Sequence, residues 1–384
     1  MSNASFLAEV FAPEAQRAQE NKFERYGLLH NPFPGREQEF HSFVFGQSQA
    51  KDQLRLRMEQ FVADGRISSV VVEADHRVGK TNFLKHYNSK LTQVFDTTLQ
   101  PNSTGPRLLP FYTNVYEYDF FFLYSRVVDR IPEGLLYALG DGLKDESLPL
   151  DSPETELAHA LRKMGREWST AGFDDGQRWE RVRVLQRWLR GGFRSLTKAE
   201  REVLGVRDNI SNTPVGSRFL RDLMNLLRSR ELLGGIVLFL DEFERLVGAG
   251  VSRGQQDRYL NDVRNFISDF QQGAFFCFAI TPAALQELHQ IYPALPPRLG
   301  TSLPLLGLRT ETEAVQFARE YEKWFRKQAE VQIPALKKPV AGWPELIGDA
   351  IIGHVYLRLR DRFGPSVPQG HFLAGLRDQV ETLV

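Results

Sequence analysis

The stretch Ser69–Leu84, SVVVEADHRVGKTNFL, decides the fold that we expect for this chain. An apolar run, Val70 to Val72, leads into a polar loop that ends in Gly79-Lys80-Thr81, and a helix-compatible segment follows. This order is typical of a phosphate-binding loop between a buried parallel strand and a helix. Amides at the helix start would point at the anion, Lys80 would reach the β- and γ-phosphates, and the Thr81 hydroxyl would hold a magnesium ion.

The loop departs from the pattern G-x-x-x-x-G-K-[ST] at its first position, which is Ala74 here. Asp75 also adds a carboxylate where phosphates would approach. The alternative is an ordinary strand, turn and helix that happens to contain Gly-Lys-Thr. The residues expected around a nucleotide are Ala74, Val78, Gly79, Lys80, Thr81 and Asn82.

A second motif begins at Gly235 and reads GIVLFLDEFERLV. Its apolar run, Ile236 to Leu240, predicts a strand buried on both faces, and Asp241 and Glu242 follow at its carboxyl edge, where α/β sheets bind ligands. In phosphoryl transfer an acid such as Asp241 holds the magnesium shell, and a group such as Glu242 orients or activates the attacking water. The alternative is that Asp241 only caps the next helix.

A third apolar strand is expected at Ala274–Ile280, and Thr281 follows it. The Thr281 hydroxyl would bond the attacking water or the γ-phosphate, or else cap the following helix. Beyond it, the Pro-rich turn YPALPPRLG carries Arg298, which would project into a neighbouring subunit and stabilise transition-state charge. We expect Arg298 on the same side of the sheet as the nucleotide. The catalytic candidates are therefore Asp241, Glu242, Thr281 and Arg298.

These motifs in this order resemble an AAA+ P-loop ATPase. The resemblance is strongest to the branch that contains origin-recognition-type initiators, transposition helper ATPases and ATPases of bacterial defence systems. The segment Tyr26–Phe33 and the helix expected at 50–63 are similar to the family's opening, which borders the adenine. The resemblance implies ATP and Mg²⁺ as cofactors, and a homo-oligomer.

Two departures from the family put hydrolysis in doubt. The lid of the family carries Gly-x-Pro-Arg, whereas the comparable turn here is Val367-Pro368-Gln369-Gly370, so its arginine is absent unless Arg358, Arg360 or Arg362 replaces it. The interval from Lys80 to Asp241 is 161 residues (241 − 80), which is longer than a compact core needs.

The expected fold is therefore α/β: a three-layered P-loop core with a parallel sheet, a helical insertion and a C-terminal helical lid. We expect residues 1–48 to border the nucleotide, residues 49–142 and 213–308 to form the core, residues 143–212 to form a basic insertion, and residues 309–384 to form the lid.

Composition limits the alternatives. The chain has 384 residues, 42% of them hydrophobic and 25% charged, with a formal net charge of zero. This balance gives no support for tight, autonomous DNA binding. A single cysteine, Cys277, excludes a disulfide framework and a cysteine-based zinc site. We expect no signal peptide or membrane span and a cytoplasmic protein.

A basic face is expected in the insertion. Arg183, Arg187, Arg190 and Arg194 recur at helical spacing and would line one side of a helix, which could contact DNA phosphates or an acidic partner. Alternatively the helix is solvated, and its arginines pair with acids elsewhere, for example Glu154, Glu156 or Asp174-Asp175. Trp179 and Trp188, interleaved with them, are expected to be core anchors.

The leading functional hypothesis is an ATP-binding and ATP-hydrolysing subunit that oligomerises and couples nucleotide state to a protein partner of the same multi-gene system, or to DNA through its insertion or pore loops. Transposition, replication and anti-phage defence are the processes considered. The main alternative is a switch or scaffold that binds nucleotide without hydrolysing it. A third possibility is a chain that keeps only the fold.

Overall fold

The structure, a computed structural model, describes residues 22–34, 43–98, 107–115, 120–142, 156–170, 173–192, 196–247, 252–332 and 342–383. The chain divides into two compact units, each described here by itself. The first comprises the described residues of Ser48–Glu73 and Phe83–Pro304, and the second those of Met1–Gln47, Ala74–Asn82 and Leu305–Val384. Arg194, Glu154 and most of the Pro-rich connector at 331–344 lie outside the described residues.

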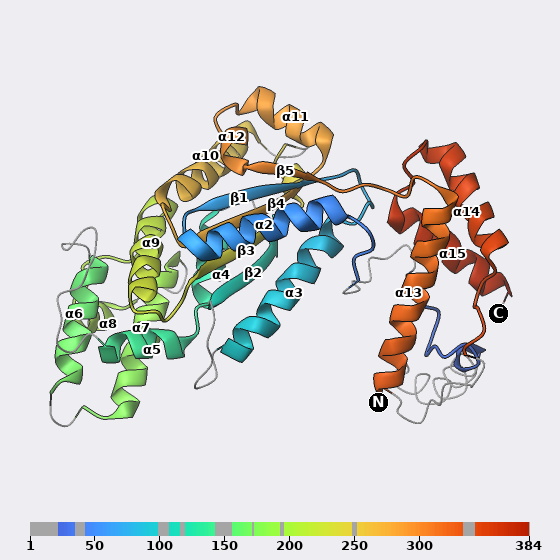
Figure 1. Ribbon diagram of the computed structural model, residues 1–384. Helices are drawn as coiled ribbons and strands as arrows, with labels where there is room; N and C mark the ends of the chain where they lie inside the picture. The colour runs from blue at the N-terminus through green and yellow to red at the C-terminus, as the bar shows by residue number, and fades with distance from the viewer. Residues whose placement is uncertain are drawn as a thin grey trace, which may run out of the picture. The chain divides into compact units, whose positions relative to one another are not determined.

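The first unit is built on five parallel strands in the order β2-β3-β4-β1-β5 (Figure 1). They are β1 (Ser68–Glu73), β2 (Leu108–Asn114), β3 (Gly235–Asp241), β4 (Ala274–Ile280) and β5 (Thr301–Pro304). Every residue of β3 and β4 is buried, because apolar side chains on both faces pack against helices. The expected parallel sheet with helices on both faces is confirmed.

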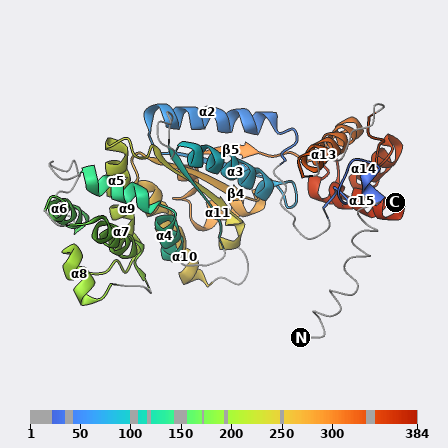
Figure 2. The ribbon, with the colours of Figure 1, turned by 90° about the horizontal axis from the view of Figure 1, so that it is seen from below.

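Helices cover the two faces of the sheet and give the three layers. On one face, Phe61 of α2 (Ser48–Asp64) packs against Phe275 of β4 with ring centroids 5.7 Å apart. On the other, Phe120 of α4 (Phe120–Asp129) and Phe266 of α10 (Arg253–Asp269) lie against Phe276 and its neighbours. Figure 2 shows α4 and α10 on the side of the sheet opposite α2.

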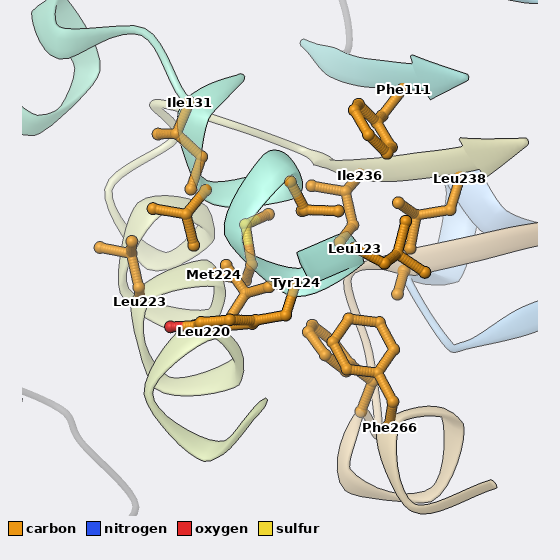
Figure 3. Packing of buried hydrophobic residues seen from close by; sticks show 14 of the residues in the cluster. Phe111, Leu123, Tyr124, Ile131, Leu220, Leu223, Met224, Ile236, Leu238 and Phe266 are labelled. Atoms are coloured by element: carbon orange, nitrogen blue, oxygen red, sulfur yellow. The ribbon is translucent and has the colours of Figure 1, made fainter. Parts of the chain in front are cut away.

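The predicted insertion is helical in its described part. Its elements are α6 (Glu156–Trp168), α7 (Asp175–Arg190) and α8 (Lys198–Leu204), which pack among α5 (Glu133–Gly142) and α9 (Thr213–Ser229). Their buried side chains belong to the same hydrophobic cluster as those of the sheet. Figure 3 shows part of this cluster, where Tyr124 of α4 and Leu220 and Met224 of α9 lie near Ile236 of β3. Trp188 is 1% exposed and its Nε1 donates to the Asp208 carbonyl at 2.9 Å, so this residue is a core anchor.

The remaining helices of the first unit follow their strands along the chain. They are α3 (Lys80–Thr98), which starts within the second unit, the short helical turn η2 (Phe243–Leu246), α11 (Pro282–Ile291) and α12 (Pro296–Leu299). None of the helices in the described part of the chain is long and apolar enough to cross a membrane.

The second unit is a helical bundle of α13 (Glu311–Gln332), α14 (Asp349–Phe363) and α15 (Gln369–Leu383). Phe33 and Phe45 of the N-terminal segment enter its core beside Phe317 and Tyr321. A charged cluster adds polar links: Arg326 donates to the carbonyls of Tyr26 and Pro344, and its partner Glu322 is 1% exposed. Burial raises the pKa of Glu322, although Arg319 and Arg326 lie beside it.

Gly300, between α12 and β5, provides a test of this packing. Its φ is +86°, and a Cβ there would lie 1.9 Å from the Ser69 carbonyl oxygen. Gly300→Ala should lower the free energy of unfolding by more than about 2 kcal/mol, because the left-handed conformation alone costs about 1 kcal/mol and the backbone of β1 must also shift. The measurement is urea unfolding.

Gly254→Ala is the matched control. Gly254 lies in the first turn of α10, and a Cβ there meets no atom within 4 Å. This substitution should leave stability unchanged or raise it by up to about 1 kcal/mol. Equal stability of the two variants would contradict the close approach of Gly300 to β1.

Candidate functional site

The predicted phosphate loop lies between β1, which ends at Glu73, and α3, which begins at Lys80. Lys80 is 7% exposed, and its Nζ donates to the carbonyls of Ala74 at 2.9 Å and Asp75 at 3.5 Å. Left-handed φ values of +63° at Arg77 and +119° at Gly79 let the backbone turn around the ammonium group. The strand, loop and helix order predicted from the sequence is thus present, and the loop curls around its lysine.

Other segments of the second unit surround this loop. The Gly370 amide at the start of α15 donates to the Arg77 carbonyl at 2.9 Å, and the Asn82 side chain donates to the Phe43 carbonyl. The atom nearest to a Cβ placed on Gly79 is Oε1 of Gln369, at 3.8 Å. The turn at 367–370, which lacks the predicted lid arginine, therefore lies against the loop and places the Gln369 side-chain amide beside Gly79.

Among the three arginines that could replace the lid arginine, Arg362 is linked through Phe363 to His371 of α15, the helix whose start lies against the loop. Its guanidinium lies 5.2 Å from the centre of the Phe363 ring, which stacks on His371 at 4.5 Å. Burial, with the charges of Arg77 and Arg362, lowers the pKa of His371. Arg358 and Arg360 are exposed on α14.

Asp241, at the end of β3, is 1% exposed and has fixed partners. Its Oδ1 accepts the Glu242 amide at 2.8 Å, and its Oδ2 accepts the Tyr112 hydroxyl at 2.8 Å. Glu242, not Asp241, is the N-cap residue of η2, and it makes no side-chain cap bond, so the helix-capping alternative for Asp241 is wrong.

Tyr112 is a site residue that sequence reasoning missed. It lies on β2, which pairs with β3 so that Asn114 is in register with Asp241. Its hydroxyl also lies 2.6 Å from Oδ1 of Asn114. The signal that could have found it is a tyrosine two residues before the strand end, in the sequence YTN.

Glu242 differs from Asp241 in exposure and partner. Its side chain is 24% exposed, and its Oε2 lies 2.8 Å from Nε of Arg245. Its φ of +57° is left-handed, which is rare for a residue with a side chain. The two adjacent carboxylates therefore have separate environments: Asp241 is buried among hydrogen-bond donors, whereas Glu242 is partly exposed and its Oε2 lies beside Arg245 without a well-aligned hydrogen bond.

Thr281 follows β4 at the same edge of the sheet as Asp241. Its hydroxyl oxygen accepts the Ala284 amide at 3.3 Å and caps α11, as the alternative from the sequence predicted. Its O–H is a donor that this cap does not use, and a catalytic role for Thr281 remains a prediction.

Arg298 is not on the side of the sheet that we expected. It lies in α12 just before β5, and its carbonyl accepts a hydrogen bond from Ser69 near the start of β1. Its guanidinium donates to the Ala294 carbonyl at 2.6 Å and to Ser268 at 3.3 Å. This is the amino edge of the sheet, about 20 Å along the strands from the carboxyl edge. The physical reason is that α11 returns along the sheet before β5 begins.

The arginine face of α7 is neutralised by acids from neighbouring helices. Arg183 lies 3.8 Å from Glu133 and 3.6 Å from Glu180, Arg190 lies 3.3 Å from Asp129, and Arg187 pairs with Glu200. Hydrogen bonds from Thr197, with the nearby Arg187, lower the pKa of Glu200.

These side chains line an open cavity of about 340 Å³ between α4, α5 and α7. The alternative of arginines paired with acids is confirmed for the described residues, although the acids are not those named from the sequence. These three arginines therefore do not form an unpaired basic surface.

No three side chains of His, Cys, Asp or Glu among the described residues are grouped so that they could hold a metal ion by themselves. In β4, burial and the charge of Asp241 raise the pKa of Cys277, so this thiol stays protonated.

Residues 154–311 match the model of a family described as "BREX system ATP-binding protein BrxC/D". The matched region contains α6 to β5 and ends at the start of α13, so it contains Asp241, Glu242, Thr281 and Arg298 but not the loop at 74–82. The match supports the predicted resemblance to an ATP-binding protein over this part of the chain, which is less than half of its length. No curated protein matches the chain.

Among solved structures, the chain is similar to the Aeropyrum pernix ORC2 protein in its ADPNP–ADP complexes, with 12% identity over 92% of this chain and 73% of that one and a TM-score of 0.40. It is also similar to the Aeropyrum pernix ORC1 protein in complex with DNA, with 14% identity over 93% of this chain and 63% of that one and a TM-score of 0.44. We draw nothing about ligands or partners from similarities at these TM-scores.

The paired arginines generate a prediction about salt. Reversing Arg183, Arg187 and Arg190 to Glu adds three carboxylates beside four existing ones and should lower stability by about 2 kcal/mol at low ionic strength. The loss should shrink at high salt, where charges are screened beyond about 3 Å. Thermal unfolding at 20 mM and 1 M NaCl measures both effects.

The same three positions changed to Gln are the control, because they remove the cations without adding repulsion. Their loss of stability should be smaller and should depend less on salt. If the reversed variant is as stable as wild type at 20 mM NaCl, the arginines do not form the ion-pair cluster described here.

Proposed function

We propose that this chain is an AAA+ subunit that binds ATP with its loop at Ala74–Asn82 and hydrolyses it with the acids at the end of β3. The observation that carries the proposal is the loop itself, which curls around a buried Lys80 at the start of α3. The description of the matched family as an ATP-binding protein supports it.

The loop offers what phosphates require. The first amides of α3 have no partner within the helix, and the helix dipole favours negative charge at this end. Lys80 supplies a cation, and Thr81 supplies a hydroxyl that would join a magnesium shell. Asp75 is solvent-exposed, so its carboxylate is not buried in the loop. Ala74 is 3% exposed, and its carbonyl is held by Lys80.

Asp241 and Glu242, at the end of β3, would have different roles in hydrolysis. Asp241, with both oxygens held by fixed donors, would anchor the magnesium shell; that ion, when bound, neutralises charge on the phosphates. Glu242 would orient a water molecule and accept its proton while the water oxygen bonds to the γ-phosphorus and the bond to the β–γ bridging oxygen breaks.

Assembly and partners belong to the same proposal. Because Arg298 lies at the amino edge of the sheet, it would serve a nucleotide of a neighbouring copy and not its own. The neutralised arginine face of α7 favours a protein partner over DNA. Coupling of nucleotide state to such a partner, in defence, replication or transposition, is the function proposed.

A second candidate is the nucleotide switch that binds ATP without hydrolysing it. Two features favour it: Nε of Arg245 lies 2.8 Å from Oε2 of Glu242, and the turn at 367–370 carries Gln369 at the position where the resemblance implies an arginine. ATP affinity is expected under both candidates, and only turnover distinguishes them.

Lys80→Ala tests binding. Loss of the cation between the phosphates should weaken ATP affinity at least tenfold, which corresponds to about 1.4 kcal/mol, as measured by titration calorimetry. Lys90→Ala makes the same change at an exposed position of α3 and should bind ATP as wild type does. Equal affinity of the two variants would remove the phosphate-loop assignment.

Glu242→Gln tests chemistry. The amide keeps the shape of the side chain but cannot accept a proton, so ATP affinity should persist while turnover falls roughly 100-fold or more. Glu287→Gln, exposed on α11, is the control and should turn over ATP at the wild-type rate. Absence of turnover in wild type, with its partners and in every oligomeric state, would favour the switch.

A further inference from the structure

Arg77, three residues before Lys80 in the phosphate loop, has a backbone conformation that favours glycine. Its φ of +63° is left-handed, and in this conformation a side chain crowds the backbone. Among the described residues of the loop at 74–82, it is the only residue other than glycine with such a φ. Strain of this kind persists where the strained residue has a function, and neither the sequence motifs nor the comparisons assign Arg77 a role.

Backbone contacts hold this strained turn. The Arg77 carbonyl accepts the Gly370 amide at 2.9 Å, and the Val78 amide donates to the Asp75 carbonyl at 3.4 Å. A Cβ placed on Gly370 would lie 3.3 Å from the Arg77 Cβ, so the start of α15 lies directly against this residue. None of these contacts uses the Arg77 guanidinium, so the shape of the loop does not depend on it.

Arg77 is exposed, and its guanidinium is unpaired within the described part of the chain. No carboxylate or carbonyl of the described residues accepts a hydrogen bond from it, and this includes the carboxylate of Asp75 in the same loop. Lys80 differs, because its ammonium group donates to the carbonyls of Ala74 and Asp75. The guanidinium of Arg77 therefore has all of its donors available for a ligand.

The surroundings of Arg77 are also positive. Burial, and then the charges of Arg77 and Arg362, lower the pKa of His371 in the first turn of α15. Both α3 and α15 begin at this loop, so the positive ends of two helix dipoles add to the charges of Lys80 and Arg77. An anion with several charges would neutralise this accumulation, and a triphosphate brings one phosphate more than a diphosphate.

The turn that faces the loop does not supply a cation. Oε1 of Gln369 is the atom nearest to a Cβ placed on Gly79, and a side-chain amide carries no net charge. A guanidinium carries a full positive charge and can donate two parallel hydrogen bonds to phosphate oxygens. Within this loop, Arg77 is thus the residue whose chemistry suits one further phosphate.

We propose that Arg77 binds the terminal phosphate of ATP and is the residue that raises affinity for ATP relative to ADP. This inference rests on the proposed function of the loop and adds a specificity-determining residue to it. It explains why an arginine occupies a left-handed position where glycine would be unstrained, because only a side chain can bring a charge there.

Arg77→Gln tests the proposal on the full chain by titration calorimetry with Mg²⁺ and either ATP or ADP. ATP affinity should fall about tenfold or more, because charge-assisted hydrogen bonds to the terminal phosphate are lost. ADP affinity should change less than about twofold, since ADP lacks that phosphate. Arg258→Gln makes the same change at an exposed position of α10 and should bind both nucleotides as wild type does.

Arg77→Gly separates loss of the side chain from damage to the loop. Glycine adopts the φ of this position without strain, so the thermal unfolding temperature should stay close to that of wild type. This variant should lose affinity for ATP as Arg77→Gln does, and it should keep its affinity for ADP.

Unchanged ATP affinity in both variants, or an equal loss of affinity for ATP and ADP, would overturn the role of Arg77 while leaving nucleotide binding by the loop standing. A wild-type chain that binds neither nucleotide would instead overturn the proposed function, and the role of Arg77 with it.

Discussion

Five parallel strands that all run in one direction, with β3 and β4 buried along their whole length, are the constraint on which the rest of this molecule depends. The side chains of β3 and β4 are apolar on both faces, so these two strands offer polar groups only where they end. The direction of the strands then sorts the residues: Asp241 and Thr281 follow carboxyl ends, and the loop at Ala74 continues from a third. The same direction puts Arg298, which precedes a strand, at the opposite edge.

Much of this framework is readable from local sequence. Runs such as GIVLFL and AFFCFAI leave no polar face, which predicts buried strands, and their ends supply the candidate acids. Residues 309–384, predicted as a helical lid, contain α13, α14 and α15, since apolar residues recur there at helical spacing. The position of Arg298 was deducible by the same logic, because a helix that connects parallel strands must return to the amino edge.

Contacts between side chains that are far apart in the sequence could not be predicted from it. Tyr112 contacts Asp241 because β2 is the neighbour of β3 in the sheet. The sequence of neither strand predicts which strand pairs with it. Asp129 and Glu133 reach the arginines of α7 from helices about fifty residues earlier in the chain. Helical spacing correctly predicts that those arginines share a face. It says nothing about which charges stand opposite, and here the opposing acids reverse the interpretation of a basic surface.

The two acids at the end of β3 show how environment separates chemically similar groups. Asp241 is buried, and its hydrogen bonds come from Tyr112 of the neighbouring strand and from the Glu242 amide, so its position cannot change without disturbing the sheet. The Glu242 side chain is partly exposed and lies beside Arg245, whose side chain is 47% exposed. A buried carboxylate with rigid donors suits a permanent anchor, whereas a surface ion pair of small net strength suits a group that changes state.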